Sequence, residues 1–298
     1  MSGTGVRSLR RCLVAGGAGA VGGMFASLLA GSGAEVVVVD PAGGDIAGDI
    51  TSPGGALVAE LGKADLVLLA VPERTGLAAI PLIAPHLRPG ALLVDTLSVK
   101  DAVVTALQGV EGVQAVSLNP MFAPALGMPG KPVATVVVHD GPAAAELLRL
   151  LAEWGGRPVL LDAERHDRLT AAAQVLTHAS VLGFGLALEE LGTDIGELGE
   201  IAPPPHATLL ALLARIASGT PEVYWDIQVA NPDAARARGA LAASVRRLAD
   251  LIDGGDEAGF AAAQGRLRDL FGTALDEHRD TCAHLFDALS ASTRIEAT

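Results

Sequence analysis

The sequence contains 298 residues, of which 50% are hydrophobic and 18% are charged. This composition excludes a disordered or low-complexity chain, and the length predicts two domains, each with an apolar core. The formal net charge is −13, and no concentrated basic segment offsets it. Such a chain repels phosphate backbones and anionic lipids, which argues against a nucleic-acid-binding or membrane-surface role.

Cysteine usage and the N-terminal segment point to a cytoplasmic protein. Cys12 and Cys282 lie far apart and outside any CxxC or Cys/His pattern, so neither a metal site nor a disulfide scaffold is predicted. Arginines precede an uncharged stretch over 12–34 that superficially resembles a signal peptide or membrane span. The glycines clustered over 16–23 are typical of a turn between a strand and a helix. We therefore expect a reducing cytoplasmic location.

Short β-branched runs alternate with helix-length segments through the first half of the chain. The expected strands are 11–15, 35–39, 65–71, 91–95, 113–118, 133–138 and 157–161. The expected helices are 20–31, 73–87, 99–108 and 142–154. Continuously apolar strands that alternate with helices predict an α/β domain with a Rossmann-type doubly wound sheet. We assign residues 1–162 to this Rossmann-type domain.

After Asp162 no strand-length β-branched run recurs, and Ala/Leu-rich segments predict a second, all-helical domain over 163–298. The expected helices are 164–191, 206–218, 221–229, 232–253, 256–271 and 273–290. The first of these is apolar on most faces, which predicts burial at the centre of the domain or at a subunit interface. We expect this domain to bind substrate and to form a homodimer.

The segment Gly17–Gly22 reads G-x-G-x-x-G directly after the first strand and opens a helix. Gly17 permits the tight turn, Gly19 lets the backbone approach a pyrophosphate, and Gly22 allows close packing of helix and strand. Asp40, at the end of the second strand, favours NAD over NADP because its carboxylate would repel a 2′-phosphate. The alternative is a glycine-rich turn with a surface aspartate. The candidate cofactor-binding residues are Gly17, Gly19, Ala20, Val21, Gly22, Asp40, Val71 and Pro72.

Ligands of open α/β sheets bind at the carboxyl ends of the strands, where three segments follow strands: 71–72, 95–100 (DTLSVK) and 118–124 (LNPMFAP). The last two resemble the D-x-x-S-V-K and H-P-M-F-G-P turns of the prephenate and arogenate dehydrogenase family. The resemblance continues through 165–167 (RHD), 174–178 (QVLTH), 215–217 (RIA) and 223–227 (VYWDI). It covers nearly the whole chain in the family's order.

The resemblance implies an NAD-dependent oxidative decarboxylation of a cyclohexadienyl substrate. Hydride leaves C4 of the ring while the C1 carboxylate departs as carbon dioxide, and aromatisation drives the reaction. Ser98 matches the family serine that hydrogen-bonds the C4 substituent and the catalytic histidine. His178 matches a histidine that faces the substrate, and Arg215 matches the arginine that binds a substrate carboxylate, a role suited to a planar bidentate donor.

Each of these residues has an ordinary structural alternative. Ser98 could cap a helix that begins near Val99, His178 could be a core histidine, and Arg215 could be a solvated helix arginine. His166 and Asp167 lie at the start of the long helix, where the sequence supports a structural capping role at least as well as a catalytic role. Lys100 is interpreted as an ordinary first-turn lysine without chemistry, and 224–226 as residues that pack or pair inside the helical domain rather than touch substrate.

The important departure is Asn119, which stands where the family carries the histidine that accepts the proton of the C4 hydroxyl. Asparagine cannot take a proton near neutral pH, so general-base assistance worth about 10²–10⁴ in rate is missing. Three explanations compete: a replacement base such as His178 or another histidine, an inactive enzyme, or a substrate that needs no base. A C4 amine is such a substrate, because its lone pair stabilises the developing cation as an iminium.

The chain therefore resembles the members of the family that convert 4-amino-4-deoxyprephenate to 4-aminophenylpyruvate in antibiotic biosynthesis. We predict Ser98, Asn119 and His178 as catalytic residues, with Arg215 binding substrate and no metal. Three alternatives remain. These are a prephenate or arogenate dehydrogenase of tyrosine biosynthesis, an inactive NAD-binding regulator, and a β-hydroxyacid dehydrogenase. The last uses a lysine after the nucleotide domain, and no lysine follows Lys131.

Overall fold

The computed structural model describes residues 8–295 and divides them into two compact units. The first unit comprises residues 8–170 and 229–232, and the second comprises 171–228 and 233–295. The boundary expected after Asp162 lies at the start of a helix, α6 (Ala163–Thr170), whereas this division falls at its end. Where the substrate domain begins in functional terms stays a prediction.

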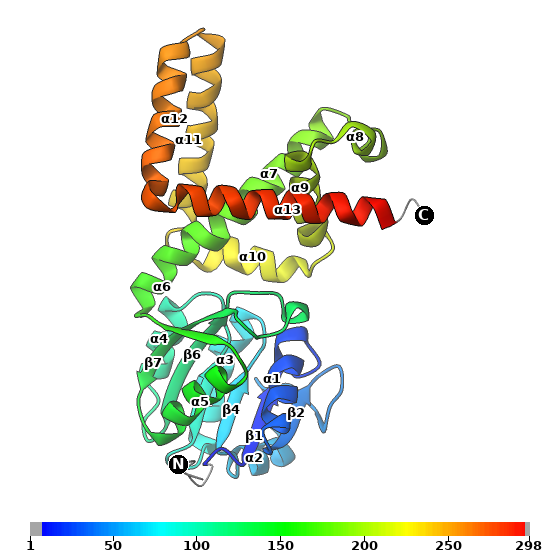
Figure 1. The fold of residues 1–298 in the computed structure, drawn as a ribbon. Coiled ribbons are helices and arrows are strands. Elements are labelled where there is room, and N and C mark those ends of the chain that lie inside the picture. Colours follow the sequence, from blue (N-terminus) through cyan, green and yellow to red (C-terminus); the bar gives the residue numbers. More distant parts are fainter. Residues whose placement is uncertain (1–7, 296–298) are drawn as a thin grey trace, which may run out of the picture. The chain divides into compact units, whose positions relative to one another are not determined.

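The first unit contains an eight-stranded sheet with strand order β3-β2-β1-β4-β5-β6-β7-β8 (Figure 1). The strands are β1 (Arg11–Ala15), β2 (Glu35–Asp40), β3 (Ile46–Ala47), β4 (Leu66–Leu69), β5 (Leu92–Asp95), β6 (Gln114–Pro120), β7 (Pro132–His139) and β8 (Arg157–Leu160). All pairings from β3 across to β6 are parallel. The order reverses between β1 and β4, which confirms the predicted Rossmann-type architecture.

Helices cover both faces of this sheet because alternate side chains of each strand enter different cores. Cys12 and Val14 of β1 pack with α1 (Ala20–Gly31) and α5 (Pro142–Glu153). Leu13 and Ala15 pack on the opposite face with α2 (Gly55–Leu61), α3 (Glu73–Ile83) and α4 (Asp101–Gln108). The carboxyl ends of β1, β4, β5 and β6 therefore share one edge of a rigid, doubly covered sheet.

Strand β7 runs antiparallel to β6, with Asn119 paired to Ala134. A parallel connection needs a crossover helix. The connecting residues 121–131 are rich in proline and glycine, and they form only a short 3-10 helix, Pro124–Leu126. The chain consequently returns as a hairpin, so the start of β7 lies beside the end of β6 at the edge where Asn119 is found.

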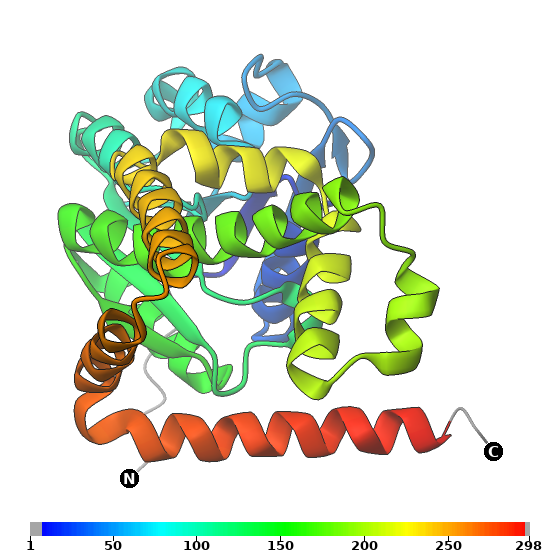
Figure 2. The ribbon, with the colours of Figure 1, turned by 90° about the horizontal axis from the view of Figure 1, so that it is seen from above.

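The second unit is helical. Its elements are a π-helical stretch (Ala171–Leu176), α7 (Thr177–Glu190), α8 (Ile195–Ile201), α9 (Pro204–Ala217), α10 (Pro221–Ala230), α11 (Ala234–Asp253), α12 (Glu257–Phe271) and α13 (Leu275–Ile295), with α10 ending in the first unit. Helix α9 packs against α7 and against α13, which is one uninterrupted helix (Figure 2). The helix predicted over 164–191 is thus α6, the π-helical stretch and α7 in succession.

This long helical segment is poorly covered by its own chain. Among the described residues, Ala163–Glu190 is long and apolar enough to cross a membrane by length and composition alone, and 17% of its apolar window is buried. Leu186 on α7 is 65% exposed, whereas Val175 and Val181 are buried. An apolar helix left this open favours the second of the two predicted environments, a subunit interface.

Candidate active site

A pocket of about 360 Å³ opens at the carboxyl ends of the strands in the first unit. Its lining comes from the ends of β1, β2 and β4 and from the segment after β3. The lining residues are Ala15, Gly16, Gly19, Val39, Asp40, Pro41, Gly48, Asp49, Ile50, Thr51, Ala70, Val71, Pro72 and Thr75. Four predicted cofactor-binding residues are among them: Gly19, Asp40, Val71 and Pro72.

The turn before α1 and the first turn of α1 itself both contain positions that depend on glycine. Gly16 has a φ of +81°, and a Cβ there would lie 2.1 Å from the carbonyl oxygen of Ala70. A Cβ on Gly22 would lie 2.2 Å from the carbonyl oxygen of Gly16, as expected for close helix–strand packing. The left-handed residue is therefore Gly16 rather than Gly17, which the sequence interpretation had given the tight turn.

The N-terminus of α1 fits a phosphate group. Its N-cap is Gly19, and no side chain caps the helix, so its first backbone amides and its positive dipole end are available to an anion. Gly17, Ala20, Val21 and Gly22 do not line the pocket. Direct contact of all eight candidate residues with NAD stays a prediction.

Two carboxylates line the pocket without a lysine or arginine among the lining residues. Asp40 accepts hydrogen bonds from the backbone amides of Ala18, at 3.2 Å, and Ala42, at 2.8 Å, so its orientation is fixed. Asp49 accepts from the backbone amide and the hydroxyl of Thr51, and these bonds lower its pKa. The pocket therefore presents negative charge where it receives a ligand.

A second group of polar residues lies at the same sheet edge, after β5 and β6. Lys100 is fully buried, and its Nζ donates to Asp95 Oδ1 at 3.2 Å and to the carbonyls of Leu97 at 2.6 Å and Leu118 at 2.8 Å. Burial lowers the pKa of Lys100, and the neighbouring Asp95 partly opposes this. The interpretation of Lys100 as an ordinary first-turn lysine was wrong, because its ammonium ties the ends of two strands together.

Asp167 caps α4 from another helix. Its Oδ1 accepts from the backbone amide of Lys100 at 2.9 Å, and its Oδ2 accepts from that of Asp101 at 2.9 Å. Helix α4 begins at Asp101 with Lys100 as its N-cap and has no side-chain cap of its own. Ser98 is therefore not the N-cap, which excludes its structural alternative.

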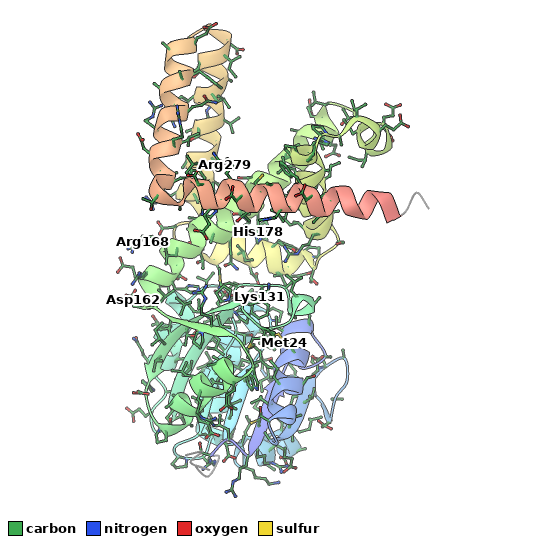
Figure 3. The ribbon with its side chains drawn as sticks, viewed as in Figure 1. Met24, Lys131, Asp162, Arg168, His178 and Arg279 are labelled. Atoms are coloured by element: carbon green, nitrogen blue, oxygen red, sulfur yellow. The ribbon has the colours of Figure 1, made fainter. Side chains whose placement is uncertain are left out.

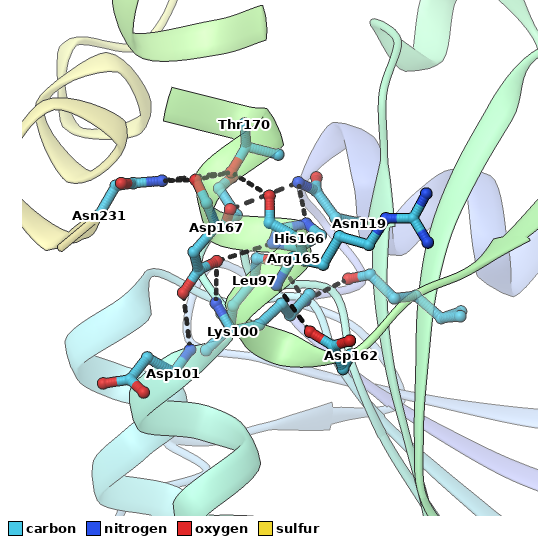
Figure 4. A network of polar contacts seen from close by, with 12 residues as sticks. Leu97, Lys100, Asp101, Asn119, Asp162, Arg165, His166, Asp167, Thr170 and Asn231 are labelled. Atoms are coloured by element: carbon cyan, nitrogen blue, oxygen red, sulfur yellow. Dashed lines mark hydrogen bonds and ion pairs between the residues drawn. The ribbon is translucent and has the colours of Figure 1, made fainter. Parts of the chain in front are cut away.

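His166 and Asn119 complete this network (Figure 4). His166 Nδ1 lies 2.7 Å from Asp167 Oδ1, and His166 Nε2 lies 3.1 Å from Asn119 Nδ2. The same amide nitrogen donates to the carbonyl oxygen of Ser98 at 3.3 Å. His166 is fully buried and Asn119 is 2% exposed. Burial lowers the pKa of His166, although the bond to Asp167 acts in the opposite direction.

The remaining predicted residues, His178 and Arg215, belong to the second unit. His178, labelled in Figure 3, packs its ring edge-on against Tyr224 with centroids 5.1 Å apart. Burial and the charge of Arg215 lower the pKa of His178. Arg215, near the end of α9, is exposed and lines a pocket of about 350 Å³ that α9 and α13 form. Trp225 is 67% exposed, so the expectation that it packs inside the helical domain is not met within one chain.

Sequence reasoning marked the segment 95–100 but gave Asp95 and Lys100 no role, and it missed Asp49. A lysine five residues after a strand-ending aspartate was available as a signal, because the chain has so few lysines. Asp49 lies in a short polar segment that no periodicity identifies. Within residues 8–295, no cluster of three or more His, Cys, Asp or Glu side chains could hold a metal ion.

Comparison with known proteins identifies both units. The sequence model described as "Prephenate dehydrogenase, nucleotide-binding domain" matches residues 51–132, and "Prephenate dehydrogenase, dimerization domain" matches residues 162–264. A 4-amino-4-deoxyprephenate dehydrogenase of Streptomyces pristinaespiralis is 52% identical over 94% of this chain and 97% of its own length. A probable arogenate/prephenate dehydrogenase of Methanocaldococcus jannaschii is 27% identical over 87% of this chain and 60% of its own length.

Solved structures share the fold at low sequence identity. A prephenate dehydrogenase of A. aeolicus, crystallised with hydroxyphenyl propionate and NAD+, matches with a TM-score of 0.67 at 20% identity, covering 89% of this chain and 99% of that one. A Synechocystis arogenate dehydrogenase matches with a TM-score of 0.63 at 17% identity, covering 90% and 99%. These likenesses agree with the observed arrangement of a Rossmann-type sheet followed by helices.

Proposed function

Because the chain belongs to the prephenate dehydrogenase family, we propose that it oxidatively decarboxylates 4-amino-4-deoxyprephenate to 4-aminophenylpyruvate, with NAD as the oxidant. The single observation that carries the choice of substrate is Asn119, buried at the carboxyl end of β6. The 52% identical Streptomyces relative supports the same choice. A place in antibiotic biosynthesis belongs to this proposal.

NAD, when bound, accepts the hydride that leaves C4 of the substrate. The uncapped start of α1 suits its pyrophosphate, and Asp40 suits the hydroxyls of the adenine ribose. Asp40 and Asp49 both disfavour a 2′-phosphate, which carries roughly −1.5 to −2 charges near neutral pH. We therefore propose that the protein prefers NAD to NADP.

The amide of Asn119 cannot serve as a general base, and His166 does not replace it. His166 is fully buried behind Asn119, with Nε2 directed at the amide nitrogen and Nδ1 at Asp167. An unprotonated C4 amine needs no base for the hydride step, because its nitrogen lone pair is a stronger electron donor than a hydroxyl oxygen and gives an iminium rather than a protonated carbonyl. The electrons of the broken C1–carboxylate bond then complete the aromatic ring and return the lone pair to nitrogen, so the amino group keeps both of its protons. The geometry therefore favours the amine over the hydroxyl compound.

We also propose that the protein is a cytoplasmic homodimer in which Ser98, His178 and Arg215 contribute to substrate binding. The match to a dimerization domain supports self-association. Exposed apolar side chains on α7, α11 and α12 also support it, because apolar surface that gathers into large patches marks interaction sites. They include Leu186, Val245, Ile252, Leu267 and Leu270. Sedimentation of the purified protein tests the dimer.

The substrate is tested by following NADH formation with 4-amino-4-deoxyprephenate, prephenate and arogenate. The proposal expects kcat/KM for the amino compound to exceed that for prephenate by about tenfold or more, in line with the usual value of a missing general base. Equal turnover of prephenate would overturn the argument from Asn119. Absence of NADH with all three compounds, despite NAD binding, would favour the inactive regulator.

A further inference from the structure

We infer that His166, held by Asp167, is a positioning residue that fixes the Asn119 amide so that its oxygen accepts a hydrogen bond from the substrate's C4 amine. This inference rests on the proposed function for the identity of the substrate. The orientation of the amide itself depends only on contacts within the first unit. It assigns His166 a role in specificity although the side chain touches no substrate.

The orientation of the Asn119 amide follows from its two neighbours. The carbonyl oxygen of Ser98 can only accept a hydrogen bond, so the amide atom 3.3 Å from it must be Nδ2. The second proton of Nδ2 points to His166 Nε2 at 3.1 Å. In Figure 4 the dashed lines from Asn119 begin at its amide nitrogen. Oδ1 makes no hydrogen bond to a described residue and is not sealed from solvent.

The tautomer of His166 follows from Asp167. A carboxylate accepts and does not donate, so Nδ1 at 2.7 Å carries the proton and Nε2 of the neutral ring keeps its lone pair. Burial lowers the pKa of His166, which keeps the ring neutral. A protonated Nε2 would face the amide protons, and turning the amide would then bring Oδ1 against the oxygen of Ser98.

The carboxylate of Asp167 is itself immobilised. It accepts from two backbone amides at the start of α4. Asn231 Nδ2 donates to the backbone carbonyl of Asp167 at 2.9 Å and contacts the Thr170 hydroxyl at 3.2 Å. A continuous set of hydrogen bonds therefore runs from the N-terminus of α4 through Asp167 and His166 to Asn119. Rotation of the Asn119 amide would disrupt it.

The free Oδ1 of Asn119 suits a substrate amine that becomes an iminium. As the C4–H bond breaks, its electron pair leaves with the hydride, and the nitrogen lone pair forms the C4–N double bond. Loss of carbon dioxide then returns the C1 electron pair to the ring, and the nitrogen recovers its lone pair in the neutral aniline. An oxygen acceptor stabilises the N–H groups most strongly when nitrogen is positive. If the amide were turned over, Nδ2 would place a hydrogen-bond donor against the positively charged nitrogen.

The amide orientation is tested without turnover by ¹⁵N NMR of the full-length protein. His166 resonances are assigned by their absence in His166→Gln. The expected spectrum has a protonated Nδ1 and an unprotonated Nε2 at about pH 7 to 8, above the ordinary histidine pKa. Both Asn119 amide protons, assigned with Asn119→Ala, should exchange slowly with solvent. A protonated Nε2, or fast exchange of both amide protons, would overturn the inference.

Kinetics test the positioning role. His166→Leu removes the acceptor, and we expect its kcat for the amino substrate to fall by about tenfold or more. The NAD dissociation constant should change little, because the cofactor pocket lies at the ends of β1, β2 and β4, whereas Asn119 lies at the end of β6. His166→Gln supplies a non-titrating acceptor and should retain kcat within about threefold. His139→Gln, at the opposite end of the β6–β7 pair, is the matched control.

Normal kcat in folded His166→Leu would overturn the inference, and so would an equal loss in the leucine and glutamine variants. If His166→Leu does not fold, the inference is judged by the kcat of His166→Gln and by the protonation of His166 Nε2 in the wild-type spectrum. If wild-type protein fails to oxidise the amino substrate, the proposed function is wrong. The NMR spectrum still tests the orientation of the Asn119 amide in that case. Wild-type protein that turns over the amine but shows a protonated Nε2 defeats only this inference.

Discussion

The ammonium group of Lys100 lies 3.2 Å from Asp95 Oδ1, and both side chains are fully buried. The two carbonyl acceptors of Lys100 lie in the turn after β5 and near the end of β6. This ion pair therefore holds the backbone that carries Ser98 against the strand that carries Asn119. Its partners depend on one another, because either charge alone would be buried without compensation.

Replacing Lys100 with methionine should destabilise the protein by about 3–5 kcal/mol, since the carboxylate of Asp95 would remain buried without its partner. The free energy of unfolding in urea measures the effect. Lys63→Met is the matched control, because Lys63 is 57% exposed in its ion pair with Glu60 and should contribute about 0–1 kcal/mol. Equal losses in the two variants would contradict a special role for the buried pair.

Asn119→His should raise the turnover of prephenate by about tenfold or more, because an imidazole at this position can accept the proton of the C4 hydroxyl. The measurement is kcat/KM for prephenate from NADH absorbance. Asn119→Ala removes the amide without adding a base, so it should bring no such gain. An unchanged rate in the histidine variant would show that proton transfer does not limit prephenate oxidation here.

Asp40→Asn should shift cofactor preference toward NADP by about tenfold, because it removes a charge that repels a 2′-phosphate without changing the size of the side chain. Asp49→Asn should act in the same direction, since hydrogen bonds from Thr51 lower the pKa of Asp49 and keep it ionised. The readout is the ratio of kcat/KM for the two cofactors. Asp140→Asn is the control and should leave the ratio unchanged, because Asp140 directly follows β7 at the end of the sheet where β6 begins.

The sheet could be predicted because its strands carry their own signal. Apolar runs such as 35–39 and 113–118 are long enough to identify buried strands, and α1 has the predicted bounds 20–31. The reversal of β7 was not predicted, because strand direction depends on the connection rather than on the strand. Residues 46–47 were missed, because two residues carry no periodicity.

The polar network shows where sequence patterns stop being informative. Ser98 and Asn119 could be placed at one sheet edge, because each follows a strand in the pattern. The bond from the Lys100 amide to Asp167, by contrast, joins residues 67 positions apart. No local pattern encodes such a contact. The resemblance marked the segment 165–167 without saying that Asp167 caps α4 or that His166 reaches Asn119.

His166 should make the protein less stable in acid. Burial lowers its pKa below the usual value of 6.5, so the unfolded chain binds a proton first as the pH falls. Stability is therefore lost from about pH 6.5 down to the lowered pKa and changes no further from this cause below it. His166→Gln should reduce the slope of unfolding free energy against pH in that window, measured by urea titration. An unchanged slope would assign the acid sensitivity to other groups.

The two cysteines should differ sharply in reactivity. Burial raises the pKa of the Cys12 thiol to about 12, so roughly one thiol in 10⁴ is ionised at pH 8. Cys282 on α13 is exposed. A colorimetric disulfide reagent should therefore label Cys282→Ser protein only after unfolding, at a rate set by the unfolding reaction. Rapid labelling of native Cys282→Ser would contradict the burial of Cys12 in the core formed by β1, α1 and α5.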